Sequence, residues 1–282
     1  MLSTKIKILI ASFVQKTINV FYKDISSMSV IKNDIHWDLD LREGIDFSIF
    51  MFGYFEKETT KALSRLIKEG DVVIDIGANI GAHSLNMAKN VGEKGMVYAI
   101  ETTNYAFNKL EKNISINPAI SNRIITKHLL LIPDIDKTND IDGIYSSWPL
   151  KQDKNKHHVH CGIKMSISGA EKNTLDNIVN DQEISKIDII KLDVDGNELD
   201  VLISGSKSIA KFKPTFVMEL GPDQYEENNN FDKVIQLMVS MGYDFYSLNE
   251  AVKYPCDSTL LRKIIPKMGS INAIAKHTHF NQ

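Results

Sequence analysis

The stretch that decides the fold is Asp71-Val-Val-Ile-Asp-Ile-Gly-Ala-Asn-Ile-Gly81. Its apolar first half predicts a buried strand over residues 71–76, and the residues after the glycines predict a helix over 82–90. A glycine-rich turn between a strand and a helix lets the backbone approach a ligand and directs free helix N–H groups at it. The stretch therefore predicts a ligand site at the end of the first strand of an α/β sheet.

Two acidic residues distinguish this turn from a dinucleotide site. A dinucleotide-binding turn reads G-x-G-x-x-G, whereas here Asn79 takes the place of the second glycine and Gly81 comes one residue early for the third. Asp75 would repel a pyrophosphate but suits a ligand that carries an ammonium and a sulfonium. Glu101, at the end of the next predicted strand, can accept both hydroxyls of a ribose. The pattern favours S-adenosylmethionine over NAD, and a turn without a ligand is the remaining alternative.

Beyond this turn, short apolar runs alternate with helical segments, which is typical of a mostly parallel α/β sheet. Further strands are predicted over residues 95–100, 123–131, 187–193, 214–220 and 243–248, and helices over 103–117, 174–185, 198–211 and 231–241. Residues 270–275 predict a seventh strand inserted near an edge of the sheet. Residues 35–41 form a separate strand-like piece ahead of the core.

Three motifs, in this order and spacing, resemble the FkbM family of S-adenosylmethionine-dependent methyltransferases. They are Val73-Ile-Asp-Ile-Gly-Ala-Asn-Ile-Gly81, Ile190-Lys-Leu-Asp-Val-Asp-Gly-Asn-Glu198, and the segment from Lys213-Pro to Glu219. The resemblance covers roughly residues 40–250. It implies a class I methyltransferase (Rossmann-like) fold with a seven-stranded, mostly parallel sheet and helices on both faces. It also implies O-methylation of a hydroxyl of a sugar, a surface glycan in polysaccharide biosynthesis, or a secondary metabolite.

The resemblance carries cofactor contacts onto individual positions. Asp75, Gly77, Asn79 and Gly81 would line the methionine side of S-adenosylmethionine, Glu101 would hold the ribose, and Asn104 would flank the nucleoside. Glu56 would lie near the amino-acid end of the cofactor. A helix N-terminal region whose acids are favoured by the helix dipole is the alternative reading of the stretch around Glu56.

A second acidic group follows the strand predicted over residues 187–193. Asp193 should project next to the transferable methyl group, with Asp195 and Lys191 on the same side, because ligands sit beyond the carboxyl ends of parallel strands. Asp193 and Asp195 are the candidate catalytic residues, Asp193 also contacting the cofactor, and Lys191 and Glu219 are candidate substrate contacts. A divalent metal on these carboxylates is possible but not favoured, so no metal ligand is assigned. For Lys191, a surface role is the alternative.

Residues 133–173 show no clear periodicity and are typical of an inserted lid that covers a substrate. Trp148 is a candidate substrate contact that could stack on a sugar ring or only anchor the lid. His160 is a candidate general base or substrate contact, and a surface hairpin is its alternative. A structural zinc site is disfavoured because the tract offers a single cysteine.

Composition narrows the protein class without naming an activity. The 282 residues include 43% hydrophobic and 24% charged residues with a net charge of −3, which excludes a largely disordered chain and argues against a nucleic-acid partner. Two cysteines favour a cytoplasmic protein. Residues 1–49 predict an N-terminal helix and appendage, and residues 50–282 the catalytic domain.

The N-terminal helix is expected to dock on the body or on a second subunit as a homodimer. Contact with a membrane surface, which would make the protein peripheral at the membrane, is the alternative. The rival functions are a Rossmann-like nicotinamide-dependent oxidoreductase and a non-catalytic S-adenosylmethionine-binding module. The expected partner is a small-molecule or glycan substrate.

Overall fold

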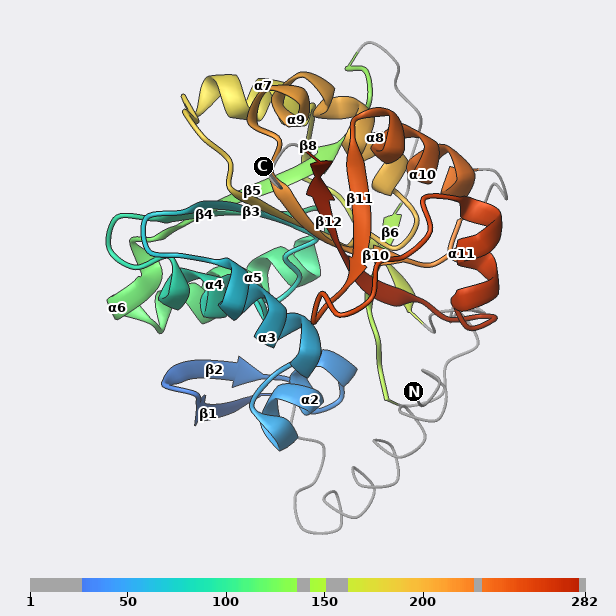
Figure 1. Cartoon of the computed structure of the whole chain (residues 1–282). Helices are drawn as coiled ribbons and strands as arrows, with labels where there is room; N and C mark the ends of the chain where they lie inside the picture. Colours follow the sequence, from blue (N-terminus) through green and yellow to red (C-terminus); the bar gives the residue numbers. More distant parts are fainter. Residues whose placement is uncertain (1–26, 136–142, 151–161, 226–229, 279–282) are drawn as a thin grey trace.

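A computed structural model describes residues 27–135, 143–150, 162–225 and 230–278 of the chain (Figure 1). The predicted N-terminal helix, with its expected membrane or dimer contact, lies outside these residues, as does His160. Within the described part of the chain, no helix is long and apolar enough to cross a membrane.

The centre of the molecule is one sheet with the strand order β11-β12-β10-β9-β3-β4-β5-β8. The parallel strands of its middle are β9 (Ile189–Leu192), β3 (Val72–Ile76) and β4 (Met96–Glu101), flanked by β10 (Thr215–Leu220) and β5 (Ile124–Leu131). At the other edge, β12 (Ile271–His277) lies antiparallel between β10 and β11 (Tyr243–Ser247). This arrangement confirms the predicted α/β class, its mostly parallel sheet and its inserted edge strand.

The sheet has eight strands, so the expectation of seven is wrong. The additional strand is β8 (Glu171–Asn173), which pairs in parallel with Leu129–Leu131 of β5. Its three residues are polar or charged, and the strand is too short to show an alternating pattern. Their strand conformation comes from pairing with the edge of β5, which leaves no signal in the sequence itself.

Helices cover both faces of the sheet, each over its own hydrophobic core (Figure 1). One face carries α3 (Lys57–Leu66), α4 (Ser84–Asn90), α5 (Asn104–Ser115) and α6 (Pro118–Ser121). The opposite face carries α7 (Leu175–Asp181), α8 (Glu198–Ser204), α9 (Ser206–Phe212), α10 (Asn230–Ser240) and α11 (Ser258–Ile264). The single helix predicted over residues 198–211 is broken at Gly205, where an added Cβ would lie 2.6 Å from Leu175 Cδ2.

The N-terminal appendage packs into the core of the face that carries α5. It consists of the hairpin β1 (Met28–Lys32) and β2 (Ile35–Leu39), followed by α2 (Gly44–Phe52). Side-chain amide oxygens of Asn113 and Asn117 accept hydrogen bonds from the β2 backbone at 2.9 and 2.8 Å. Residue 49, the predicted domain boundary, lies inside α2.

The described parts of the insertion form a second hairpin, β6 (Gly143–Ser147) with β7 (Ile163–Ser166). This hairpin is tied to the appendage, because Gly44 N donates to Trp148 O at 2.9 Å and Leu150 N donates to Arg42 O at 2.8 Å. The hairpin is thereby held next to the carboxyl end of β4, where its Ser146 reaches the residues of the glycine-rich turn.

Candidate active site

The glycine-rich turn leaves β3 and curls over the end of β4. Gly77 N and Ala78 N donate to Ile100 O at 3.1 and 3.0 Å, which fixes the path of the turn. Gly77 has φ +79, and a Cβ there would lie 1.9 Å from Asp193 O, so only glycine fits. Asn79 is also left-handed, with φ 49. The turn therefore sits against the ends of both neighbouring strands, β4 and β9.

Glu101 ends β4 with its carboxylate inside a hydrogen-bond network. Its Oε2 accepts from Asn79 N at 2.9 Å, and its Oε1 accepts from Thr103 N and Thr103 Oγ1 at 2.8 Å each. Ser146 of the insertion joins the network, because its Oγ lies 2.7 Å from Thr103 Oγ1 and Asn79 Nδ2 donates to Ser146 O at 3.1 Å. These donors fix the orientation of the carboxylate. Sequence reasoning missed Ser146, since nothing in the irregular insertion marks it.

Asp75 and Lys191 form a buried ion pair beneath the turn. Lys191 Nζ lies 3.2 Å from Asp75 Oδ1 and 3.7 Å from Asp193 Oδ2, and it donates to Gly77 O at 3.1 Å. Ser84 Oγ donates to the other oxygen of Asp75 at 2.5 Å. Burial alone would lower the pKa of Lys191, but the two carboxylates raise it above its ordinary value, so the ammonium stays charged. Lys191 thus links the turn to the end of β9, and its predicted role as a substrate contact stays a prediction.

Three further acids lie near the end of β9. Asp195 is in the loop after this strand, Glu198 begins α8, and Glu219 is on β10. Asp195 is left-handed with φ 48, and burial together with repulsion from Asp193 raises its pKa well above the ordinary value. Burial and the same repulsion raise the pKa of Glu219, whose carboxylate accepts from Gln224 Nε2 at 2.9 Å and from Ser270 Oγ. Glu198 accepts from the backbone N–H groups of Val194 and Gly196 at 3.3 Å, so it stabilises the loop.

Glu56 joins the same group of carboxylates from the loop before α3. Its backbone is left-handed with φ 46, and its Oε2 accepts from Asn272 Nδ2 at 2.9 Å. Asn272 lies on β12, and it also donates to Thr59 Oγ1 at 3.0 Å. His83, two residues beyond the last glycine of the turn, places its Nε2 3.9 Å from Glu56 Oε2. Sequence reasoning missed His83 and Asn272, although the position of His83 directly after the turn was available as a signal.

Two further residues, predicted to contact the substrate and the cofactor, are Trp148 and Asn104. Trp148 N and Ser147 Oγ donate to Glu43 Oε2 at 2.9 and 3.0 Å, so Trp148 sits where the insertion meets the appendage. Asn104 begins α5, and its buried Oδ1 has no hydrogen-bond partner among the described residues. Both roles stay predictions.

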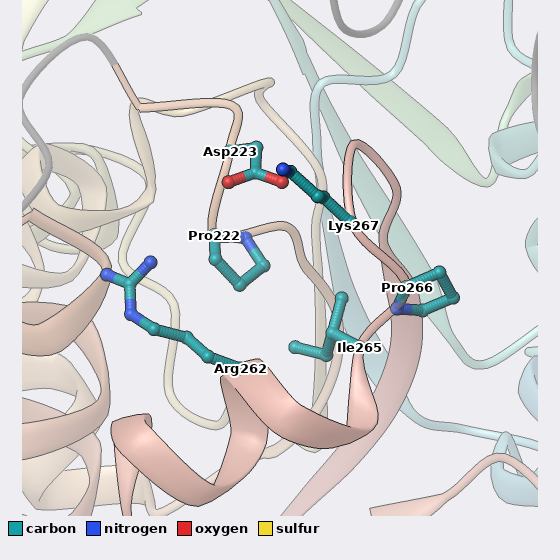
Figure 2. Close-up of a pocket in the computed structure, with 6 residues that line it drawn as sticks. All are labelled: Pro222, Asp223, Arg262, Ile265, Pro266 and Lys267. Atoms are coloured by element: carbon teal, nitrogen blue, oxygen red, sulfur yellow. The ribbon is translucent and has the colours of Figure 1, made fainter.

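A cavity of about 240 Å³ opens beyond the end of β10 (Figure 2). It is lined by Pro222, Asp223, Arg262, Ile265, Pro266 and Lys267. Arg262 is engaged by Asp232 at 3.2 Å, and Asp223 Oδ2 accepts from Met268 N at 2.7 Å. Within the described ranges, no three His, Cys, Asp or Glu side chains are grouped so that they could hold a metal ion.

A first strand that carries Asp75, a glycine-rich turn after it and Glu101 at the end of the neighbouring parallel strand form the arrangement expected of a class I methyltransferase. The family comparison agrees with this class. The model of the methyltransferase FkbM domain matches residues 75–245, and the chain therefore belongs to the FkbM family of S-adenosylmethionine-dependent methyltransferases. The same match argues against the alternative function of a nicotinamide-dependent oxidoreductase.

Three solved structures that are similar to this chain share little sequence with it. A putative rRNA methylase from Clostridium thermocellum is 13% identical with a TM-score of 0.44, covering 78% of this chain and 93% of that chain. Methyltransferase FkbM from Methylobacillus flagellatus is 14% identical with a TM-score of 0.45, covering 76% of this chain and 48% of that chain. An S-adenosylmethionine-dependent O-methyltransferase from Thermotoga maritima is 14% identical with a TM-score of 0.44, covering 92% and 81%. No curated protein matches the chain. The family assignment therefore rests on the domain match.

Proposed function

We propose that this protein transfers a methyl group from S-adenosylmethionine to a hydroxyl oxygen of a sugar, a surface glycan or a secondary metabolite. The observation that carries the proposal is the position of Asp193. Its side chain is 24% exposed, whereas its neighbours Lys191 and Asp75 are almost fully buried. A carboxylate that solvent can reach, at the strand end beside the cofactor turn, is placed to meet the hydroxyl of an acceptor.

The residues present fit the cofactor. Carboxylates come from Glu56, Asp75 and Asp193, and the ammonium of Lys191 is already engaged by two of them. Among the described residues this leaves an excess of negative charge for a sulfonium and an ammonium. Glu101 ends β4 beside the turn, with a carboxylate that the backbone N–H of Asn79 holds at 2.9 Å, and in this proposal it accepts from the ribose hydroxyls. When bound, S-adenosylmethionine supplies a methyl group on a positively charged sulfur.

The chain's own residues then have two tasks in this proposal. Methyl transfer is an in-line displacement, so the first task is to hold the acceptor oxygen on the axis of the breaking bond. The second is to remove the hydroxyl proton, for which Asp193 is the candidate base and Asp195 the second candidate catalytic residue. Lys191 Nζ, 3.7 Å from Asp193 Oδ2, helps to orient the carboxylate of Asp193.

Transfer of a labelled methyl group tests the proposal. Purified protein, labelled S-adenosylmethionine and fractions of cell glycans, lipid-linked sugars and small hydroxylated metabolites should give a product whose label resists alkali, because a methyl ether is stable to base. A label that alkali releases as methanol would indicate a carboxylate acceptor and refute O-methylation of a hydroxyl. No transfer to any fraction, with the cofactor bound, would favour the non-catalytic binding module.

Variants then test the role of Asp193. Asp193→Asn should lower kcat about a hundredfold or more, the range of general-base catalysis, with a small change in cofactor affinity. Asp181→Asn, at the exposed end of α7, is the matched control and should keep full turnover. Full turnover in Asp193→Asn would exclude Asp193 as the base.

A further inference from the structure

His83 is a buried histidine with unused hydrogen-bonding capacity. Its side chain is 4% exposed, and neither ring nitrogen has a hydrogen-bond partner among the described residues. The ring of Phe55 lies 6.0 Å away in a tilted arrangement and covers one side of the imidazole. A polar group buried without a partner costs free energy, so an orphaned imidazole at a ligand turn indicates a partner that the chain itself does not provide.

The carboxylate of Glu56 lies close to the imidazole of His83. His83 Nε2 and Glu56 Oε2 are 3.9 Å apart, which is too long for a hydrogen bond between them. A single nitrogen donor placed beside the two atoms could reach both at ordinary hydrogen-bond length. Asn272 Nδ2 holds Glu56 Oε2 at 2.9 Å, so this acceptor is fixed in position before a ligand arrives.

The ionisation of the ring decides what kind of group it can meet. Burial, together with the nearby ammonium of Lys191, lowers the pKa of His83 to about 4, although the carboxylates of Asp75 and Asp193 act in the opposite direction. The imidazole is therefore neutral at neutral pH and offers one lone pair. A neutral ring accepts a hydrogen bond from an ammonium, whereas Glu56 would repel a carboxylate brought to the same place.

We propose that His83 Nε2 and Glu56 Oε2 together form a two-acceptor site for the primary ammonium of the ligand's amino-acid end. This inference rests on the proposed function, since it assigns residues to one end of S-adenosylmethionine. In the site, His83 is a binding residue that positions the cofactor by one end. The proton of the neutral ring resides on Nδ1 in this arrangement, which leaves Nε2 as the acceptor.

Four ligands without a sulfonium separate the contacts at this end of the cofactor. S-adenosylhomocysteine carries both an ammonium and a carboxylate, its decarboxylated form keeps the ammonium, its deaminated form keeps the carboxylate, and 5′-methylthioadenosine has neither. Their dissociation constants are measured by calorimetric titration with the wild type and with three variants. His83→Leu removes the acceptor at similar volume, His83→Gln places an amide oxygen near Nε2, and His36→Leu is the control on the exposed face of β2.

His83→Leu should raise the dissociation constants of S-adenosylhomocysteine and its decarboxylated form about tenfold to a hundredfold, which is the range for the loss of a hydrogen bond to a charged group. It should change the deaminated form and 5′-methylthioadenosine less than about twofold, and His83→Gln should recover part of the loss. His36→Leu should bind all four ligands as the wild type does.

Two patterns would overturn the inference. A loss confined to the two carboxylate ligands would assign His83 to the carboxylate, and an equal loss for all four would give it a packing role only. Retained binding of 5′-methylthioadenosine shows that each variant is folded. A wild type that binds none of the four would instead refute the proposed function.

Discussion

Lys191→Met removes the ammonium beneath the glycine-rich turn and leaves Asp75 as a buried charge without its cationic partner. Asp75 is fully buried, and after the substitution Ser84 Oγ would be its remaining polar partner among the contacts described above. The variant also loses the hydrogen bond from Nζ to Gly77 O at 3.1 Å, which ties the turn to β9. Methionine keeps most of the volume of the lysine stem, so the effect is electrostatic rather than a cavity effect.

The expected loss is about 3–5 kcal/mol of unfolding free energy, the cost of removing one partner of a buried ion pair. For a chain of this size, that corresponds to a fall in Tm of roughly 6–20 °C, at about 2–4 °C per kcal/mol. The sign of the pH dependence follows from the raised pKa of Lys191 in the folded state. The stabilisation is fully present below the ordinary pKa of 10.5 and is lost as the pH rises above it towards the higher folded-state pKa.

Urea unfolding followed by circular dichroism measures the loss, with Lys253→Met as the matched control. Lys253 pairs with Asp244 at 2.7 Å, a shorter contact than that of Lys191, but its side chain is 55% exposed. An exposed pair contributes little, so this variant should unfold at the wild-type urea concentration. If Lys191→Met lost less than about 1 kcal/mol, or no more than the exposed pair, the reasoning from burial would be refuted.

Three further predictions concern the turn and its acids. Gly77→Ala should lower the free energy of unfolding by about 3 kcal/mol or more, measured by thermal unfolding, because its Cβ would lie 1.9 Å from a carbonyl oxygen. Gly70→Ala, with φ +87 and a nearest contact of 3.9 Å, should lower it by only about 1 kcal/mol. Equal losses in the two variants would contradict a steric cause. Burial and a neighbouring carboxylate raise the pKa of Asp195, so affinity for the cationic S-adenosylmethionine, measured by calorimetry, should increase as the pH rises through that raised pKa. Asp195→Asn should flatten that increase. Glu101→Gln should raise the dissociation constant of 5′-methylthioadenosine about tenfold in the same assay. Glu111→Gln, on the exposed side of α5, should bind this ligand as the wild type does. Unchanged binding in Glu101→Gln would exclude the ribose contact.

The central strands of the fold were predictable because a strand that is buried on both faces needs a continuous run of apolar residues. Residues 71–76 and 95–100 are continuous apolar runs, and the observed β3 and β4 agree with them to within one or two residues. The inserted β12 was also predicted. By contrast, α11 was not predicted, although Asp257 caps it by accepting from Leu260 N at 2.8 Å. Its short length of seven residues, with only Leu261 buried, leaves too weak a periodicity to detect.

The candidate site was predictable where it lies at strand ends in one motif. Asp75, Glu101 and Asp193 were each placed by the rule that ligands bind beyond the carboxyl ends of parallel strands, and the structure brings all three to that edge. The direction of the Lys191 side chain was not predictable. Alternation along a strand gives a face of the sheet, whereas the choice between substrate and the Asp75 carboxylate depends on three-dimensional packing.

By itself, the sequence determined the class of the sheet, the position of its central strands along the chain and the acids at their ends, because strand burial, turn glycines and strand-end chemistry are all local patterns. The tertiary structure alone decided which distant residues complete the site. His83 meets Glu56, Asn272 of β12 holds that carboxylate, and Ser146 of the insertion reaches the network of Glu101. The physical reason is that each of these contacts joins elements far apart in the chain, where no local pattern records that two side chains will meet.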